Sequence, residues 1–196
     1  GLRAANVDGT SRALALADAL AIPSVVYASS IEAQGLGSDH EIPLREDSAC
    51  RPVSDYGQSK VQAEELVTKW GSLPGHRALV LRIGNIYGPG SAWFLHPSLL
   101  ALLGATPIRA IWTKLRHRLF QPLFIDDLVE GISRAVDRRL VGTYNVTGEE
   151  PVTIEGYLAA LASLTQLTDR VQLMRTPVEP SGRSLSIAPD FAYLLM

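Results

Sequence analysis

The sequence has one cysteine, no pattern of a secretory leader, and no uninterrupted apolar run that approaches the length of a membrane span. The single cysteine, Cys50, cannot form an internal disulfide, which suits a reducing compartment. We therefore expect a cytoplasmic protein that does not associate with a membrane. The formal net charge of −2 at pH 7 gives no reason to expect a nucleic-acid partner.

Two kinds of ligand site are also missing from the sequence. No G-x-G-x-x-G or G-x-x-G-x-x-G pattern occurs, and the glycines Gly35 and Gly37 are completed by neither a further glycine nor a helix. A glycine-rich loop for a dinucleotide pyrophosphate is therefore absent from these 196 residues. The adjacent acids Asp126 and Asp127 have no histidine or cysteine nearby, so we predict that they begin a helix and bind no metal.

The residues that are present fit one well-buried domain with a small appendage, since 46% are hydrophobic and 19% are charged. Strand-like and helix-like runs alternate along the chain, which indicates an α/β fold. The predicted strands span residues 24–30, 78–83, 142–148 and 171–175. The predicted helices run from about residue 11 to 21, from 55, from 126 to about 139, and from 153, with Thr153 as the cap of the last.

Tyr56 and Lys60 are four residues apart in a predicted helix, so their side chains lie on one face, one turn from each other. A phenol beside an ammonium group can donate and accept a proton. The neighbouring cation should favour the phenolate and lower the pKa of Tyr56 towards neutrality. The alternative is a pair of solvated side chains without any chemistry.

The surroundings of this pair favour the chemical interpretation. The strand that ends in Ser29-Ser30 precedes it, and a second strand leads into the segment Gly84-Asn85-Ile86-Tyr87-Gly88-Pro89-Gly90 after it. An Asn-Val-x-Gly-Thr motif lies at residues 6–10. This ordered set resembles the extended short-chain dehydrogenase/reductase superfamily, the nucleotide-sugar epimerases and dehydratases with their reductase relatives. The resemblance covers nearly all of residues 4–175.

The resemblance implies the carboxyl-terminal part of a Rossmann-like, doubly wound parallel sheet with a small substrate-binding subdomain. Residues 1–90 and 120–150 would form the remainder of the dinucleotide-binding domain. Residues 91–119 and 151–196 would form the substrate-binding subdomain. The chain is expected to begin in mid-domain, so the pyrophosphate loop and the residue that selects NAD or NADP would lie upstream of Gly1.

The resemblance also implies roles for individual residues. The catalytic set is Ser30, Tyr56 and Lys60; the cofactor, NAD or NADP, would contact Ala28, Ser29, Tyr56, Lys60, Ile83 and Ile86; the substrate would contact Ser30, Glu32, Asn85, Arg116 and Arg118. Glu32 stands where the 4,6-dehydratases carry an acid–base glutamate, but a solvated surface glutamate is the alternative. For Asn85 the alternative is a simple turn, and for the two arginines it is a solvated surface.

The expected activity is that of an NAD(P)-dependent epimerase/dehydratase-type oxidoreductase acting on a carbinol or carbonyl group, with a nucleotide sugar as the small-molecule substrate. A reductase of ketones or aldehydes is the alternative within the superfamily, and a non-catalytic remnant with the same fold is the alternative outside it. The full-length protein is expected to be a homodimer, with Ala13, Leu16, Ala17, Leu66 and Val67 as candidate contacts on two outer helix faces.

Overall fold

The computed structural model describes residues 1–35, 43–91 and 116–165. Two compact units divide the chain: the first comprises Gly1–Gly84 and Asp126–Thr147, and the second comprises Asn85–Ile125 and Gly148–Met196. These break points differ by six, six and three residues from the expected 90/91, 119/120 and 150/151, and the assignment of the parts to cofactor and substrate stays a prediction. Each unit is described by itself below.

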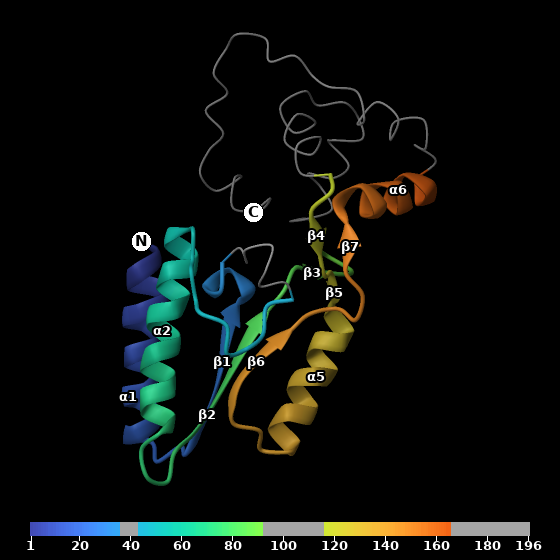
Figure 1. Cartoon of the computed structure of the whole chain (residues 1–196). Helices are drawn as coiled ribbons and strands as arrows, with labels where there is room; N and C mark the ends of the chain where they lie inside the picture. The colour runs from blue at the N-terminus through green and yellow to red at the C-terminus, as the bar shows by residue number, and fades with distance from the viewer. Residues whose placement is uncertain (36–42, 92–115, 166–196) are drawn as a thin grey trace. The chain divides into compact units, whose positions relative to one another are not determined.

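The first unit contains a parallel sheet of three strands in the order β1-β2-β6. Its strands are β1 (Ser24–Ser30), β2 (Arg77–Ile83) and β6 (Gly142–Val146), close to the three strands predicted there. The register places Ser30 opposite Ile83, and Ile83 opposite Val146, so all three strands end at one edge (Figure 1). In parallel sheets this carboxyl edge is where ligands bind.

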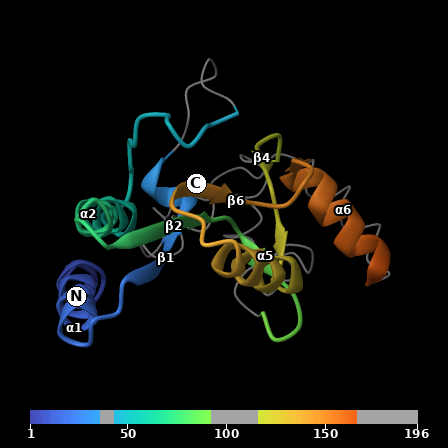
Figure 2. The ribbon, with the colours of Figure 1, turned by 90° about the horizontal axis from the view of Figure 1, so that it is seen from below.

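Helices cover both faces of this sheet, as a doubly wound fold requires (Figure 2). The helices α1 (Gly9–Ala19) and α2 (Asp55–Gly71) lie on one face, where Leu14, Val67 and Trp70 pack around Val80 of β2. The helix α5 (Ile125–Asp137) covers the other face, where its Ala135 packs on Leu79 and Leu81. Because side chains alternate along a strand, β2 is buried on both sides.

Among the strands that the structure describes, β1 lies at the edge of the sheet and pairs with β2 alone. Its apolar residues are typical of a buried strand, but every second residue from Ser24 to Ala28 is exposed, including Val26 at 42%. The reason is that the described helices on the α5 side cover β2 and β6 and leave that face of β1 open. The strand therefore has the apolar composition of an interior strand in an edge position.

Helix α1 begins earlier than the sequence suggested, because a π-helical turn, η1 (Ala4–Asp8), runs directly into it. The backbone N–H of Gly9 donates to the carbonyl of Ala4, and the Thr10 hydroxyl donates to the carbonyl of Asn6 at 2.6 Å. Two of the candidate dimer contacts are buried within the unit itself, Ala17 in α1 and Val67 in α2. They cannot contact a second subunit.

The described residues of the second unit form two small sheets. Strand β3 (Ile86–Tyr87) pairs in parallel with β5 (Leu123–Phe124), and β4 (Leu119–Phe120) pairs antiparallel with β7 (Val152–Thr153). Helix α6 (Ile154–Leu164) follows β7, and its cap is Thr153 as predicted, whose hydroxyl accepts from the Gly156 N–H at 3.0 Å. The strand predicted at 171–175 lies outside the described residues.

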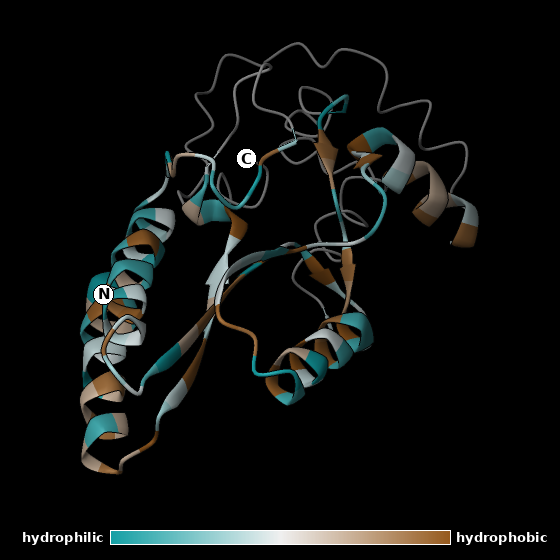
Figure 3. Cartoon of the chain, turned by 60° about the horizontal axis from the view of Figure 1, so that its bottom comes forward, coloured by the Kyte–Doolittle hydropathy of each residue, from teal (hydrophilic) through white to brown (hydrophobic). Residues whose placement is uncertain are grey.

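The helices of both units carry apolar and polar residues together, as Figure 3 shows for α5 and α6. In α5 the buried positions are Leu128 and Ala135, and the acids Asp126 and Asp127 stand in its first turn, as expected. None of the helices in the described part is long and apolar enough to cross a membrane.

Candidate active site

The three residues expected to act together do meet at the carboxyl edge of the sheet. Ser30 is the last residue of β1, and Tyr56 and Lys60 stand one turn apart at the start of α2. The Ser30 hydroxyl lies beside the Tyr56 phenol and favours its ionised form, although the two make no hydrogen bond of standard geometry in this structure. All three side chains are partly exposed, so a ligand could reach them.

Lys60 is held between two aromatic rings. Its ammonium nitrogen lies 5.1 Å from the centre of the Tyr27 ring and 5.5 Å from that of Tyr56. The same nitrogen donates a hydrogen bond to the carbonyl of Ala28 at 2.8 Å. Burial lowers the pKa of Lys60, and the nearby Glu64 carboxylate opposes that shift. One of the three ammonium donors is thus used by the protein.

Tyr56 does not have the lowered pKa that the sequence suggested. Burial raises the pKa of the Tyr56 phenol, the negative charge of Glu32 raises it further, and the Ser30 hydroxyl lowers it only in part. The physical reason is that the Lys60 ammonium donates to the Ala28 carbonyl, while the phenol is partly buried and is exposed to the negative charge of Glu32. Tyr56 is therefore a protonated phenol at neutral pH, which suits a proton donor.

Glu32 is half-buried, which corrects its interpretation as a solvated surface residue. It lies in a 3₁₀ turn, η2 (Ile31–Ala33), directly after Ser30, and its Oε2 accepts a hydrogen bond from the Ser54 hydroxyl at 2.9 Å. Burial raises the pKa of Glu32, and the bond from Ser54 lowers it. Its backbone is also close to α2, since a Cβ added to Gly57 would stand 2.4 Å from the Glu32 carbonyl oxygen.

Two polar residues that the sequence did not single out fix the start of α2. Ser54 caps the helix, and its hydroxyl accepts from the Gly57 N–H at 2.9 Å while it donates to Glu32. Ser59 donates to the carbonyl of Tyr56 at 2.7 Å and accepts from the side chain of Asn6 at 2.9 Å. Ser54 could have been found, because a serine before an acidic first turn is a capping signal.

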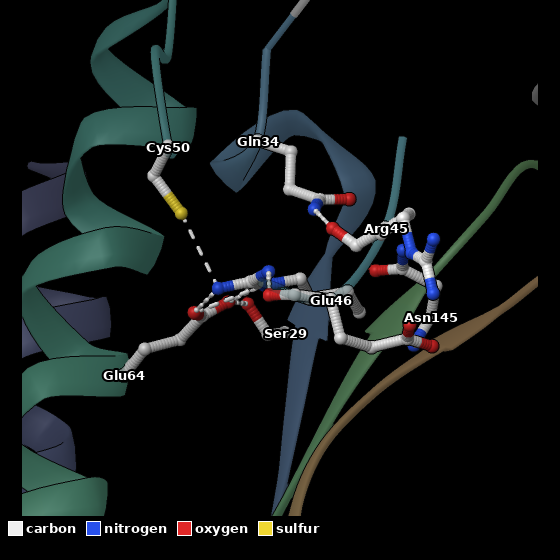
Figure 4. Close-up of polar contacts among 8 residues, drawn as sticks. Ser29, Gln34, Arg45, Glu46, Cys50, Glu64 and Asn145 are labelled. Atoms are coloured by element: carbon white, nitrogen blue, oxygen red, sulfur yellow. Dashed lines mark hydrogen bonds and ion pairs between the residues drawn. The ribbon is translucent and has the colours of Figure 1, made fainter. Parts of the chain in front are cut away.

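Ser29, expected to contact the cofactor, points its side chain into the protein. It is 5% exposed, and its hydroxyl donates to Glu64 of α2 (Figure 4). Glu64 in turn forms an ion pair with Arg82 of β2. A cofactor could therefore meet Ser29 only through its backbone. Among the other expected contacts in this unit, Ala28 offers a carbonyl already bound by Lys60, and Ile83 packs towards α5.

Four expected site residues belong to the second unit. Asn85 accepts a hydrogen bond from Leu123 through its backbone, and Ile86 is an exposed residue of β3. Arg116 donates to the neighbouring His117 at 2.9 Å, and Arg118 is exposed. Within the described residues, no group of His, Cys, Asp and Glu could hold a metal ion.

Comparison with known proteins gives a family match over most of the chain. The model of the NAD dependent epimerase/dehydratase family matches residues 2–147. A UDP-glucose 4-epimerase of Azospirillum brasilense is 30% identical over 102 residues, which cover 46% of this chain and 29% of the relative. A GDP-6-deoxy-D-mannose reductase of Pseudomonas aeruginosa is 37% identical over 65 residues, which cover 33% of this chain and 21% of the relative.

Solved structures show the same fold. A short-chain dehydrogenase/reductase superfamily protein from Agrobacterium tumefaciens, solved with bound NAD, superposes with a TM-score of 0.69 at 25% identity. The match covers 82% of this chain and 58% of that one. RMD from Pseudomonas aeruginosa, solved with NADPH, gives a TM-score of 0.70 at 24% identity over 84% of this chain and 58% of that one. The present chain thus spans less than two thirds of these proteins. With its family match over residues 2–147, it belongs to the NAD dependent epimerase/dehydratase family.

Proposed function

We propose that this chain carries the proton-transfer residues of an NAD(P)-dependent epimerase/dehydratase-type oxidoreductase that acts on a carbinol or carbonyl group of a nucleotide sugar. The observation that carries the proposal is the meeting of Ser30, Tyr56 and Lys60 at the carboxyl edge of the sheet. The substrate class is supported by the relatives, whose names state that they act on UDP-glucose and on a GDP-linked deoxysugar.

In this proposal Tyr56 and Ser30 act on one substrate oxygen, and Lys60 acts on Tyr56. Tyr56 gives a proton to that oxygen when it is a carbonyl, and removes the proton when it is a hydroxyl. Ser30 donates a hydrogen bond to the same oxygen and so holds it beside the phenol. Lys60 is the only cation next to the Tyr56 ring among the described residues, and it stabilises the phenolate left after proton donation.

The residues present fit one end of a nicotinamide dinucleotide. Lys60 is half-buried, stands beside Tyr56 and keeps ammonium donors beyond the one bound to Ala28, so it can bind the hydroxyls of a ribose. The bound nicotinamide would supply hydride transfer. The pyrophosphate end is not matched, since the sequence has no glycine-rich loop. The choice between NAD and NADP is left open.

The protonated state of Tyr56 supports the reductive direction in particular. A phenol with a raised pKa is ready to donate a proton to an oxygen that receives a hydride, whereas proton removal needs the phenolate. The similarity to a GDP-6-deoxy-D-mannose reductase points the same way. A reductase is therefore the second candidate. It would consume a reduced cofactor, whereas an epimerase would first take a hydride from the substrate and then give it back, which regenerates the oxidised cofactor.

The remaining assignments extend this proposal. We assign the first unit to the cofactor and the second to the substrate, with Asn85, Arg116 and Arg118 as candidate substrate contacts there. Glu32 is a candidate substrate contact beside Tyr56, and its half-buried carboxyl group suits that place. The cytoplasmic location stays a prediction from the sequence.

The experiment is the variant Tyr56→Phe in the full-length protein, assayed with UDP-glucose and other nucleotide sugars in the presence of NAD or NADPH. Loss of a general acid–base group should lower turnover by roughly two to four orders of magnitude, with little change in stability. The control is Tyr144→Phe, which removes a half-exposed phenol from β6 of the same unit. Near-normal turnover in Tyr56→Phe would exclude the mechanism, and no turnover in the wild type would favour a non-catalytic protein.

A further inference from the structure

A buried ion pair connects helix α2, which carries Tyr56 and Lys60, to strand β2. Arg82 of β2 and Glu64 of α2 are each 6% exposed. The Arg82 Nη2 lies 2.8 Å from Glu64 Oε2, and its Nε lies 3.1 Å from both carboxylate oxygens. Such a pair is weak evidence for stability, because the loss of hydration offsets the attraction between the charges. Its position suggests that the pair instead holds neighbouring segments of the chain in place.

The guanidinium of Arg82 also contacts a segment far from it in the sequence. Its Nη1 donates to the backbone carbonyl of Glu46 at 3.1 Å, and its Nη2 lies 3.2 Å from the Cys50 Sγ. One planar group with five donors therefore contacts Glu64 of helix α2 on one side and residues 46 and 50 on the other. A lysine has neither the number of donors nor the fixed geometry to do this.

Strand β6 holds the same segment from a second direction. The backbone N–H of Asn145 donates to the Glu46 carboxylate at 3.0 Å, and the Asn145 side chain donates to the Leu44 carbonyl at 3.3 Å. Residues 43–51 contain no helix and no strand apart from one isolated bridge between Arg51 and Gly35. Side chains of the sheet and its connections, and not a backbone ladder, therefore account for most of the contacts that fix this segment.

The segment leads straight to the start of the catalytic helix. Three residues after Arg51 stands Ser54, which caps α2 two residues before Tyr56. At its other side, the ion pair contacts the strand that ends in the catalytic serine, because Glu64 accepts from the Ser29 hydroxyl. Arg82 and Glu64 thus connect the segment, the helix and the strand whose residues meet at the site.

We propose that Arg82 is a positioning residue, which fixes residues 43–51 against helix α2 and so holds the connection that enters the helix at Ser54. This role goes beyond the proposed activity and does not depend on it, because it concerns contacts within the chain alone.

The single cysteine of the chain makes the proposal measurable. Cys50 is the only thiol, so its rate of reaction with a disulfide reagent such as dithionitrobenzoate reports on residues 43–51 directly. In Arg82→Lys the charge stays and the planar group is lost, and labelling should become about tenfold faster, as expected when one or two net hydrogen bonds are removed. Arg77→Lys, at the exposed first residue of the same strand, is the matched control and should react at the wild-type rate.

The chemistry of the thiol decides which variant is read for exposure. Burial raises the pKa of Cys50, the charge of Arg82 lowers it, and the charges of Glu64 and Glu65 raise it. In Arg82→Lys the positive charge stays and Glu64 is unchanged, so faster labelling there reports exposure of residues 43–51 and not a lower thiol pKa. In a variant that loses both Arg82 and Glu64, the two charge effects on the thiol oppose each other.

A second variant separates positioning from stability. In the double variant Arg82→Met with Glu64→Met, apolar residues of similar volume replace the ion pair, and the resistance to urea should stay near that of the wild type. Its Cys50 should still react as fast as in Arg82→Lys. A wild-type labelling rate in either folded variant would overturn the proposal. Failure of both variants to fold, judged by circular dichroism, would also overturn it, because the pair would then be needed for stability itself.

Discussion

Replacement of Ser54 by alanine should destabilise the first unit by an amount that depends on pH. The Ser54 hydroxyl is buried and makes two hydrogen bonds, one from the Gly57 N–H and one to the Glu32 carboxylate, both at 2.9 Å. Loss of a helix cap costs about 1 kcal/mol. Loss of the bond to a half-buried carboxylate costs about 1 kcal/mol more, after allowance for solvent. The expected total at pH 7 is about 2 kcal/mol.

The contribution of the hydrogen bond from Ser54 to the Glu32 carboxylate should disappear in acid. Burial raises the pKa of Glu32 above its ordinary value of 4.5, so ionisation of Glu32 opposes folding and stability falls as the pH rises through the folded-state pKa. The hydrogen bond from Ser54 stabilises the ionised carboxylate and so reduces this loss of stability. Ser54→Ala removes the bond, and the loss of stability becomes larger. At pH 4, Glu32 is largely protonated in both states, so only the cost of the lost cap, about 1 kcal/mol, should remain.

Urea denaturation followed by circular dichroism measures both values. With a slope of about 2 kcal/mol/M, the midpoint of Ser54→Ala should fall by about 1 M at pH 7 and by about 0.5 M at pH 4. Thr153→Ala is the matched control, because Thr153 caps α6 through the Gly156 N–H and donates to no carboxylate among the described residues. Its midpoint should fall by the same amount at both pH values. An equal fall for Ser54→Ala at both pH values would refute the link to Glu32.

Three further predictions concern packing, cofactor and assembly. Gly57→Ala should destabilise the protein by about 2 kcal/mol, since the new Cβ would lie too close to the Glu32 carbonyl oxygen. Gly131→Ala in α5, where a Cβ would enter open space, should stabilise it by about 0.5–1 kcal/mol. Urea denaturation would contradict this if Gly57→Ala were the more stable of the two variants. The 196-residue chain should not bind NAD or NADP in calorimetric titration, because no glycine-rich helix start receives the pyrophosphate, and saturable low-micromolar binding would show otherwise. The full-length protein should be a homodimer in light scattering at micromolar concentration, with the exposed Leu16 of α1 in the contact, and a monomeric mass would count against it.

The sheet and helix α2 could be predicted because their signals are local. The run of β-branched and apolar residues in 24–30 specifies a strand, and the spacing of Tyr56 and Lys60 specifies a shared helix face once the helix is known to begin at Asp55. The edge position of β1 does not follow from its composition, which is that of an interior strand; it is a property of the topology, since β1 pairs only with β2 among the described strands.

The electrostatics of the site could not be predicted, because they depend on contacts between distant residues. Spacing alone suggested that Lys60 would lower the pKa of Tyr56, but the direction of the ammonium is decided by the Ala28 carbonyl, 32 residues away. The hydrogen bond that Glu32 accepts comes in the same way from a distant residue, Ser54, 22 residues away. A charged pair such as Glu64 and Arg82 is expected at the surface from composition, and only the packing of α2 on β2 encloses it.

The row formed by Tyr56, Lys60 and Glu64 limits where this protein can change its length. The three residues follow at intervals of four along α2, and the last two bind consecutive residues of β1, Lys60 the carbonyl of Ala28 and Glu64 the hydroxyl of Ser29. An insertion or deletion of one residue between 56 and 64 would rotate part of this row by about 100° around the helix, and the helix could no longer bind both strand positions. After Glu64, an insertion or deletion would in the same way turn Val67 and Trp70 out of the buried core. Length variation around this helix should therefore be tolerated in the turn at residues 72–76, where Gly75 has open space around it.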